Sequence, residues 1–252
     1  MSRFFVSREQ IGTDSITVTD GDYNHIKNVL RKKVGEELEL CDGEGTDYRC
    51  AIEKYDTHCC YLKILSRTNA TTELPVDLIL YQGLPKKDKM ELIIQKSVEL
   101  GVHSIVPVMC ERTIVKLEDK NREERKIERF RIISETAAKQ CGRGIVPDVE
   151  MPVSFRDAVL KAEQKNEYLI VPYENALGMK ATEEAFSEGL KHGKIAVMIG
   201  PEGGFDPAEI EFAKEHNAHI ISLGRRILRT ETAGLTVLSA LMLLTEYREE
   251  RE

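Results

Sequence analysis

The spacing of hydrophobic residues changes at about residue 70. Before that point, short runs of alternating apolar and polar residues are separated by turn sequences such as DGEG at 42–45, which is typical of short antiparallel strands. Ile26, Val29 and Leu30 instead lie at the spacing of one helix face. We therefore expect a small antiparallel β-barrel with one inserted helix in residues 1–70. The strand candidates are residues 3–6, residues 15–18 and the runs within 36–66, and the helix candidate is residues 20–33.

The polar stretch RTNATTELP, at 67–75, separates this region from one with a different rhythm. From residue 75 to residue 252, apolar strand-like runs alternate with helical segments. Such alternation predicts a parallel α/β sheet with helices on both faces. The strand runs are residues 76–83, 104–110, 167–174, 194–200 and 218–224, and the helical segments are 87–101, 121–141, 181–190 and the apolar last helix.

A glycine-rich loop, GPEGG at 200–204, ends the strand predicted at 194–200. Glycine lets a ligand or another backbone approach closely, because it has no Cβ. Asp206, Pro207 and Glu209 then supply the cap and first turn of a helix. Ligands of open α/β sheets bind at this edge, although paired glycines also occur in plain turns. The stretch matches neither G-x-G-x-x-G nor G-x-x-x-x-G-K-[ST], which disfavours a dinucleotide or nucleoside triphosphate cradle.

A second loop, RRILRTET at 225–232, brings three arginines to the same edge of the sheet. Adjacent arginines are a poor choice for a plain connection, since their mutual repulsion requires an acidic partner. A third strand end supplies Pro172 and Glu174. Three such loops, apolar apart from glutamate and arginine, could enclose a flat heteroaromatic ring and read its edges with backbone groups.

Composition and charge narrow the classes of function. The chain is 41% hydrophobic and 31% charged, as in ordinary globular proteins, and its six cysteines show no C-x-x-C or Cys/His metal spacing. We therefore expect reduced thiols, no metal, and a cytoplasmic protein without signal peptide or membrane span. The net charge of −7 argues against nucleic acid, but residues 84–143 carry 14 basic residues against ten acidic ones. Local basic clusters favour phosphate contact, although each could also be a solvated surface.

The two loop sequences resemble the signature motifs of a known family. IGPEGGF at 199–205 and LGRRILRTETA at 223–233 are similar to those of the RsmE-type 16S rRNA uridine-N3 methyltransferases, in the SPOUT class of S-adenosylmethionine-dependent enzymes. HIKNVLRKKVGE at 25–36, the segment 86–108 and AAKQCGRGIVP at 137–147 also match the pattern. The resemblance covers nearly the whole chain.

The resemblance implies an α/β protein with a PUA-like RNA-binding β-barrel in residues 1–70 and a SPOUT methyltransferase domain in residues 75–252. The second domain should carry a trefoil knot over a mostly parallel sheet. S-adenosylmethionine is the implied cofactor, 16S rRNA or the assembled small ribosomal subunit the implied partner, and a homodimer the implied assembly. The residues that would hold the cofactor are Pro172, Glu174, Ile199, Gly200, Pro201, Glu202, Gly203, Gly204, Leu223, Gly224, Ile227, Leu228, Thr232 and Ala233.

The implied reaction transfers a sulfonium methyl group to N3 of one uridine, and it needs no metal because that methyl group is already activated. Uridine N3 holds a proton at neutral pH, so the enzyme must generate or stabilise the anion. Arg229 is the candidate for stabilising the anion and Glu231 for accepting the proton. A phosphate contact or an ion pair with Glu231 stays open for Arg229, and a capping role for Glu231. The candidate RNA contacts are Arg31, Lys32, Lys33, Lys86, Lys87, Lys89, Lys139, Arg143, Arg225 and Arg226.

Two other functions compete with this one. A nicotinamide-dependent oxidoreductase requires G-x-G-x-x-G with an acidic residue about 20 positions later, which neither strand–loop–helix unit supplies. A non-catalytic RNA-binding or ribosome-assembly factor would use the barrel and the basic middle segment. It would leave the two glycine–arginine loops without a purpose.

Overall fold

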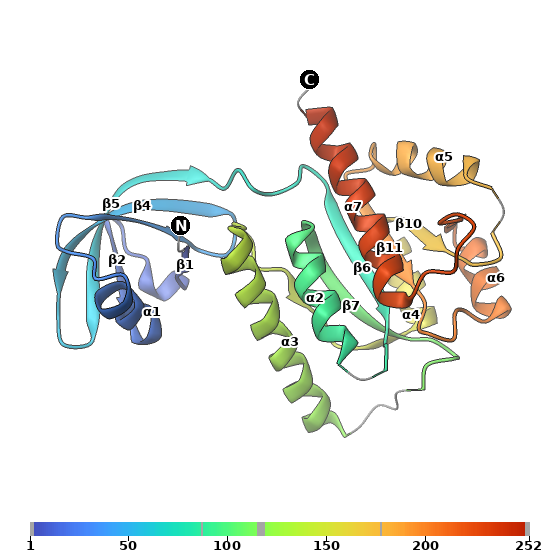
Figure 1. Cartoon of the computed structure of the whole chain (residues 1–252), viewed down its shortest axis with the longest axis horizontal. Helices are drawn as coiled ribbons and strands as arrows, with labels where there is room; N and C mark the ends of the chain where they lie inside the picture. The colour runs from blue at the N-terminus through green and yellow to red at the C-terminus, as the bar shows by residue number, and fades with distance from the viewer. Residues whose placement is uncertain (1–2, 87, 115–118, 177, 250–252) are drawn as a thin grey trace. The chain divides into compact units, whose positions relative to one another are not determined.

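The computed structural model describes residues 3–86, 88–114, 119–176 and 178–249. The chain folds as two compact units (Figure 1). The first consists of residues 3–73 and 138–146, and the second of the described parts of 74–137 and 147–249. The sequence prediction ended the first domain at residue 70 and began the second at residue 75. It gave no sign that residues 138–146 return to the first unit.

A curled, half-barrel sheet forms most of the first unit. Its strands lie in the order β1-β3-β4-β5-β2; β1 and β3 pair in parallel, and the other neighbours pair antiparallel. Ile16, Leu40, Ile52 and Leu62 are buried on its inner face, as the alternating pattern predicted. The strands are β1 (Phe4–Phe5), β2 (Ser15–Thr19), β3 (Glu37–Cys41), β4 (Thr46–Tyr55) and β5 (Cys59–Asn69), and a short 3-10 helix, η1 (Arg8–Gln10), follows β1.

The inserted helix is shorter than predicted and changes its winding. The helix α1 (Asp20–Asn24) continues into a π-helical turn, η2 (His25–Val29), which takes about one residue more per turn than an α-helix. Because the following side chains are rotated, Ile26 is buried while Val29 is 69% exposed. The prediction that both face the same side was wrong. The helix stops before residue 33, and Arg31 adopts a left-handed φ of 52°.

Glu73 ties residues 138–146 to the first unit. Its carboxylate pairs with the guanidinium of Arg143, 3.1 Å from Nε, and accepts hydrogen bonds from the backbone amides of Gly144 at 2.8 Å and Ile145 at 3.2 Å. A side chain at Gly144 would collide with Ala70. These partners lie some seventy residues apart in the chain, so no local sequence pattern could reveal them.

A parallel sheet forms the centre of the second unit. Its strand order is β12-β10-β11-β6-β7-β8, with β9 beside β7, and its described pairs are parallel, which confirms the prediction. The strands are β6 (Asp77–Gly83), β7 (Val102–Met109), β8 (Asp148–Val149), β9 (Val153–Ser154), β10 (Tyr168–Pro172), β11 (Lys194–Ile199) and β12 (His219–Ile221).

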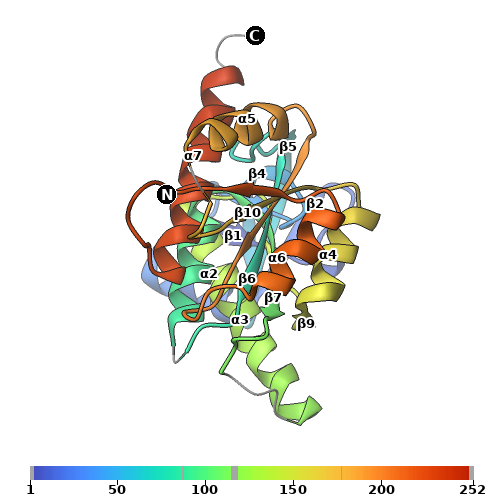
Figure 2. The same cartoon turned by 90° about the vertical axis from the view of Figure 1, so that its right-hand side faces the viewer.

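Helices cover both faces of this sheet, with α2 and α7 on one face and α4 and α6 on the other (Figure 2). Phe155, Val159 and Ile210 pack against strand residues such as Met198 on the second face. The helix α4 was not predicted, although its capping residue Ser154 was a signal for it. Within the described ranges no helix is long and apolar enough to span a membrane. The helices are α2 (Lys89–Glu99), α3 (Lys120–Cys141), α4 (Phe155–Gln164), α5 (Lys180–Gly189), α6 (Pro207–Glu215) and α7 (Thr230–Glu249).

Candidate active site

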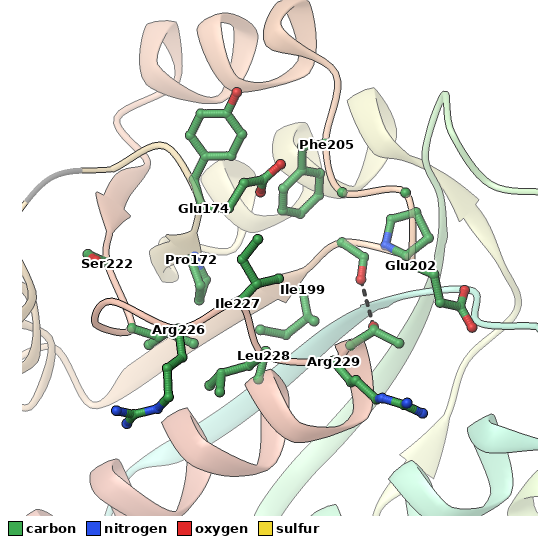
Figure 3. A pocket seen from close by; sticks show the side chains of 18 of the residues that line it. Pro172, Glu174, Ile199, Glu202, Phe205, Ser222, Arg226, Ile227, Leu228 and Arg229 are labelled. Carbon is green, nitrogen blue, oxygen red and sulfur yellow. Dashed lines mark hydrogen bonds between the residues drawn. The ribbon is translucent and has the colours of Figure 1, made fainter.

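The two loops singled out in the sequence meet at one edge of the parallel sheet. Thr230, the first residue of α7, donates a hydrogen bond from Oγ1 to the carbonyl oxygen of Gly200 at 2.6 Å, drawn as the dashed line in Figure 3. The same hydroxyl accepts a hydrogen bond from Nε2 of Gln82, on β6, at 2.9 Å. Thr230 and Gln82 are both buried. The loop after β11 and the start of α7 are therefore joined directly, and the start of α7 is also bound to β6.

Glycines allow the close approaches within this edge. A Cβ on Gly83, at the end of β6, would lie 2.6 Å from the backbone nitrogen of Pro201. Gly204 has a φ of 69°, and a Cβ on it would lie 2.8 Å from Oε1 of Glu174. Its amide donates to the carbonyl oxygen of Pro201 at 2.9 Å and closes a tight turn. Both positions admit a larger residue only if their neighbours move.

The helix that follows the glycine loop begins as the sequence predicted. Asp206 caps α6 by accepting a hydrogen bond from the amide of Ala208 at 3.0 Å, and Glu209 accepts one from the amide of Asp206 at 2.8 Å. Arg112, from the loop after β7, donates to the carbonyl oxygen of Gly203 at 3.2 Å and lies 3.3 Å from the Asp206 carboxylate. Sequence reasoning missed Arg112, because it follows a different strand.

A cavity of about 530 Å³ opens between the loops, within the range of roughly 300–1,000 Å³ that small-molecule sites occupy. Ile199, Leu228 and Phe205 give it apolar walls, and Glu174 brings a carboxylate to it (Figure 3). Ile227 is 88% exposed although it lines the cavity. The predicted cofactor-binding residues that line the cavity are Pro172, Glu174, Ile199, Gly200, Pro201, Glu202, Gly203, Gly204, Leu223, Gly224, Ile227, Leu228 and Ala233.

Some residues of the site differ from the prediction. Thr232 is not among the residues that line the cavity; its amide donates to the carbonyl oxygen of Arg229, the residue before α7, at 2.9 Å. Of the two catalytic candidates, the exposed Arg229 lines the cavity and Glu231 does not. Phe205 and Thr230 lie within the two loop motifs, so their position was a signal for them. The lining residues that sequence reasoning did not assign to this site are Tyr173, Phe205, Ser222 and Thr230, together with Lys89, Arg225 and Arg226, which it assigned to RNA.

An ion-pair cluster lies beside the cavity. The Nζ atom of Lys89 is 3.0 Å from Oε1 of Glu202 and 3.2 Å from Oε2 of Glu231. Partial burial works against the charged form of Glu202, but hydrogen bonds from backbone amides and from Lys89 outweigh it and hold the pKa of Glu202 below its ordinary value. The hydrogen bond to Glu202 is the main reason why the pKa of Lys89 is raised. Lys89, a predicted RNA contact, makes ion pairs with these two carboxylates.

The other predicted RNA contacts differ in their exposure and in their acidic neighbours. Lys139 lies 3.9 Å from Asp22, and Lys32 lies 3.5 Å from Glu36. Arg143 is corrected, because its side chain is only 6% exposed and pairs with Glu73, so it does not present its charge to a phosphate. Lys87 lies outside the described residues. The exposed candidates are Arg31, Lys33, Lys86, Arg225 and Arg226.

The cysteine thiols and the acidic side chains do not form a metal site in the described part of the chain. All six cysteines are free thiols, and four of them are buried. Among the residues that the structure describes, no group of three or more His, Cys, Asp or Glu side chains could hold a metal ion.

Comparisons with known proteins match both units. Residues 72–242 match the model of an RNA methyltransferase domain, and residues 18–65 match that of an RNA methyltransferase PUA domain. The crystal structure of the ribosomal RNA small subunit methyltransferase E of Neisseria gonorrhoeae bound to S-adenosyl methionine is 31% identical, with a TM-score of 0.81 over 97% of this chain and 98% of that one. A methyltransferase of Legionella pneumophila in complex with the same cofactor is 31% identical, with a TM-score of 0.75 over 96% and 97%.

The half-barrel, the parallel sheet and its loop cavity, taken with these matches, define an RNA methyltransferase with a PUA domain and a SPOUT-type catalytic domain. The ribosomal RNA small subunit methyltransferase E of Bacillus subtilis is 35% identical over 252 residues, which cover 98% of each chain. The chain belongs to the ribosomal RNA small subunit methyltransferase E family. The resemblance found in the loop motifs is thereby confirmed.

Proposed function

We propose that this protein transfers a methyl group from S-adenosylmethionine to N3 of one uridine in small-subunit ribosomal RNA. The observation that carries the proposal is the junction of the two motif loops over one cavity through Thr230 and Gly200. Relatives of this chain carry the rRNA methyltransferase name, and two solved relatives hold the cofactor.

The chemistry of the cavity fits this cofactor. Ile199 and Leu228 offer apolar surfaces to an adenine ring, and the loop backbone offers hydrogen-bonding groups to its edges. Apart from its chain neighbours, no atom of the described residues lies within 4 Å of a Cβ placed on Gly224, so a ligand can approach the backbone there. Glu174 can accept hydrogen bonds from hydroxyl or amino groups. When bound, S-adenosylmethionine supplies an activated methyl group and leaves as a neutral thioether.

Two charged residues act on the uracil ring that receives the methyl group. Arg229, exposed beside the cavity, stabilises negative charge at O2 or O4 of the uracil ring. Glu231, two residues later in α7, accepts the proton that N3 loses. The loops align N3 with the methyl group, and such positioning can lower the barrier by several kcal/mol. Arg229 is assigned because it lines the cavity, and Glu231 because of its carboxylate and its place two residues later, since it does not itself line the cavity.

The RNA is held by basic residues of both units in this proposal. The PUA-like unit contributes Arg31, Lys32 and Lys33, and the second unit contributes Lys86, Arg225 and Arg226; Lys139 is a weaker candidate, since Asp22 lies 3.9 Å away. Phosphate contacts of this kind make binding salt-dependent. We place the reaction in the cytoplasm with its ribosomal substrate, and we keep the trefoil knot as a prediction.

We also propose a homodimer. Leu243, Leu244 and Tyr247, on the last turns of α7, are 60%, 40% and 57% exposed, and an apolar stripe of this kind favours a protein contact. Light scattering should give twice the chain mass of 28.6 kDa. A mass of one chain at micromolar concentration would contradict the dimer.

Methyl transfer can be tested with small-subunit rRNA and methyl-labelled S-adenosylmethionine. We expect one labelled uridine, located by mass spectrometry of nuclease fragments. Reverse transcription should stop there, because a methyl group on N3 blocks the Watson–Crick edge. Label on carbon 5 or on a ribose hydroxyl would contradict the N3 assignment. If the protein binds S-adenosylmethionine but transfers no methyl group to rRNA, it is a binding protein rather than an enzyme.

A further inference from the structure

Lys89 lies where three segments of the second unit meet. It begins α2, and its ammonium group contacts Glu202 in the glycine loop and Glu231 at the start of α7, at 3.0 and 3.2 Å. The side chains of Lys89, Glu202 and Glu231 are 30%, 26% and 17% exposed. Because the cluster is partly shielded from water, its charges act on each other more strongly than surface charges do.

Glu202 is also bound to the start of α2 by a backbone contact. The amide of Lys86 donates to Oε1 of Glu202 at 3.1 Å and lies 3.3 Å from Oε2. The exposed side chain of Lys86 is not needed for this contact. Lys89 therefore adds to the backbone contact a charged link that also reaches Glu231.

We propose that Lys89 is a positioning residue of the active site, which holds the glycine loop against the start of α7 through Glu202 and Glu231. Without its ammonium group, two carboxylates would face each other across the junction and repel. The two loops would separate, and the cavity between them would lose the shape that binds the cofactor. This inference rests on the proposed function of that cavity.

A positioning role for Lys89 and a phosphate contact by Lys89 predict different effects on cofactor affinity and on RNA binding. A positioning lysine affects S-adenosylmethionine affinity in the absence of RNA. A lysine that contacts a phosphate affects the salt dependence of RNA binding, since each neutralised phosphate adds about one to the slope of log K against log salt. The two measurements therefore separate the alternatives for Lys89.

The experiment compares Lys89→Met, which keeps the unbranched chain up to the ε carbon and removes the ammonium group, with Lys89→Arg, which keeps the charge. By titration calorimetry, we expect Lys89→Met to weaken S-adenosylmethionine binding about tenfold and Lys89→Arg to restore most of the affinity. The double variant Lys89→Met with Glu202→Gln should also recover part of it, because one of the two repelling carboxylates becomes neutral. The salt slope of RNA binding should stay at the wild-type value in Lys89→Met.

Two lysines serve as controls. Lys96→Met removes one charge from the same helix and one ion pair, with Glu99 at 2.8 Å, and should leave cofactor affinity unchanged. Lys86→Met should reduce the salt slope of RNA binding. Thermal unfolding shows that each variant is folded before it is titrated.

Wild-type affinity in Lys89→Met, or a reduced salt slope with unchanged cofactor affinity, would overturn the positioning role. Failure of the proposed function would look different, because the wild-type protein itself would then bind no S-adenosylmethionine.

Discussion

At the scale of single residues, Gly204 shows how sequence and site constrain each other. Its φ of 69° favours glycine, and a Cβ there would press on the Glu174 carboxylate at 2.8 Å. The first constraint concerns the stability of the loop, whereas the second concerns the cavity that Glu174 lines. A substitution should reveal both effects separately.

We predict that Gly204→Ala lowers the free energy of unfolding by about 1–2 kcal/mol and also weakens S-adenosylmethionine binding. Gly193→Ala is the matched control, since Gly193 has a φ of 72° but, apart from its chain neighbours, no atom of the described residues within 4 Å of an added Cβ. It should show a similar loss of stability and wild-type affinity. Denaturant titration and calorimetry measure the two quantities. Equal cofactor affinity in both variants would remove the Glu174 contact from the account.

The pair of Glu73 and Arg143 is the corresponding residue-scale feature of the first unit. Burial disfavours the charged form of Glu73, but the guanidinium of Arg143 and the amides of Gly144 and Ile145 outweigh it, so the pKa of Glu73 lies below its ordinary value of 4.5. A lowered carboxyl pKa contributes stability that is present above pH 4.5 and is lost as the pH falls through the lowered pKa.

Arg143→Met should therefore cost about 3 kcal/mol of unfolding free energy at pH 7, and its deficit should shrink as the pH falls below 4.5. Arg49→Met, which breaks the exposed pair with Glu37, should cost much less than Arg143→Met, because water and salt screen an exposed pair. Urea denaturation at several pH values checks both. A deficit that stays constant into acid would show that Arg143 acts through packing rather than through the charge of Glu73.

At the scale of elements, the site depends on how α7 is attached to the sheet. Its first residue, Thr230, bonds to Gly200 and to Gln82 on β6, so a single hydroxyl joins helix, loop and strand. The loops on either side contribute the cavity. Loss of this hydroxyl should therefore lower the affinity for the ligand as well as the stability of the fold.

Thr230→Val keeps the shape of the side chain and removes the hydroxyl. We expect a loss of about 1–3 kcal/mol in stability and a measurable decrease in S-adenosylmethionine affinity. Thr245→Val is its control, because Thr245 is also buried in α7 but its hydroxyl bonds only to Leu241 of the same helix, at 2.8 Å, among the described contacts. If both variants bind the cofactor equally well, the junction at Thr230 does not shape the cavity.

At the scale of the whole molecule, local patterns predicted the parallel sheet and the two loops at its edge. They succeeded because strand runs and capping residues such as Asp206 are encoded within a few positions. They failed at the π-helical turn at 25–29, which changes the helical period, and at the return of residues 138–146, which depends on Glu73 far earlier in the chain. They also could not reveal the ion pairs of Lys89, because its partners, Glu202 and Glu231, are distant in sequence.

The loops at 199–205 and 223–233 are proposed to hold one cofactor between them, and a crystal structure of the protein with S-adenosylmethionine tests this most directly. We predict density for the ligand between the two loops, with its adenine ring against Ile199 and Leu228. Density at any other place, with this cavity empty at saturating ligand, would contradict the account.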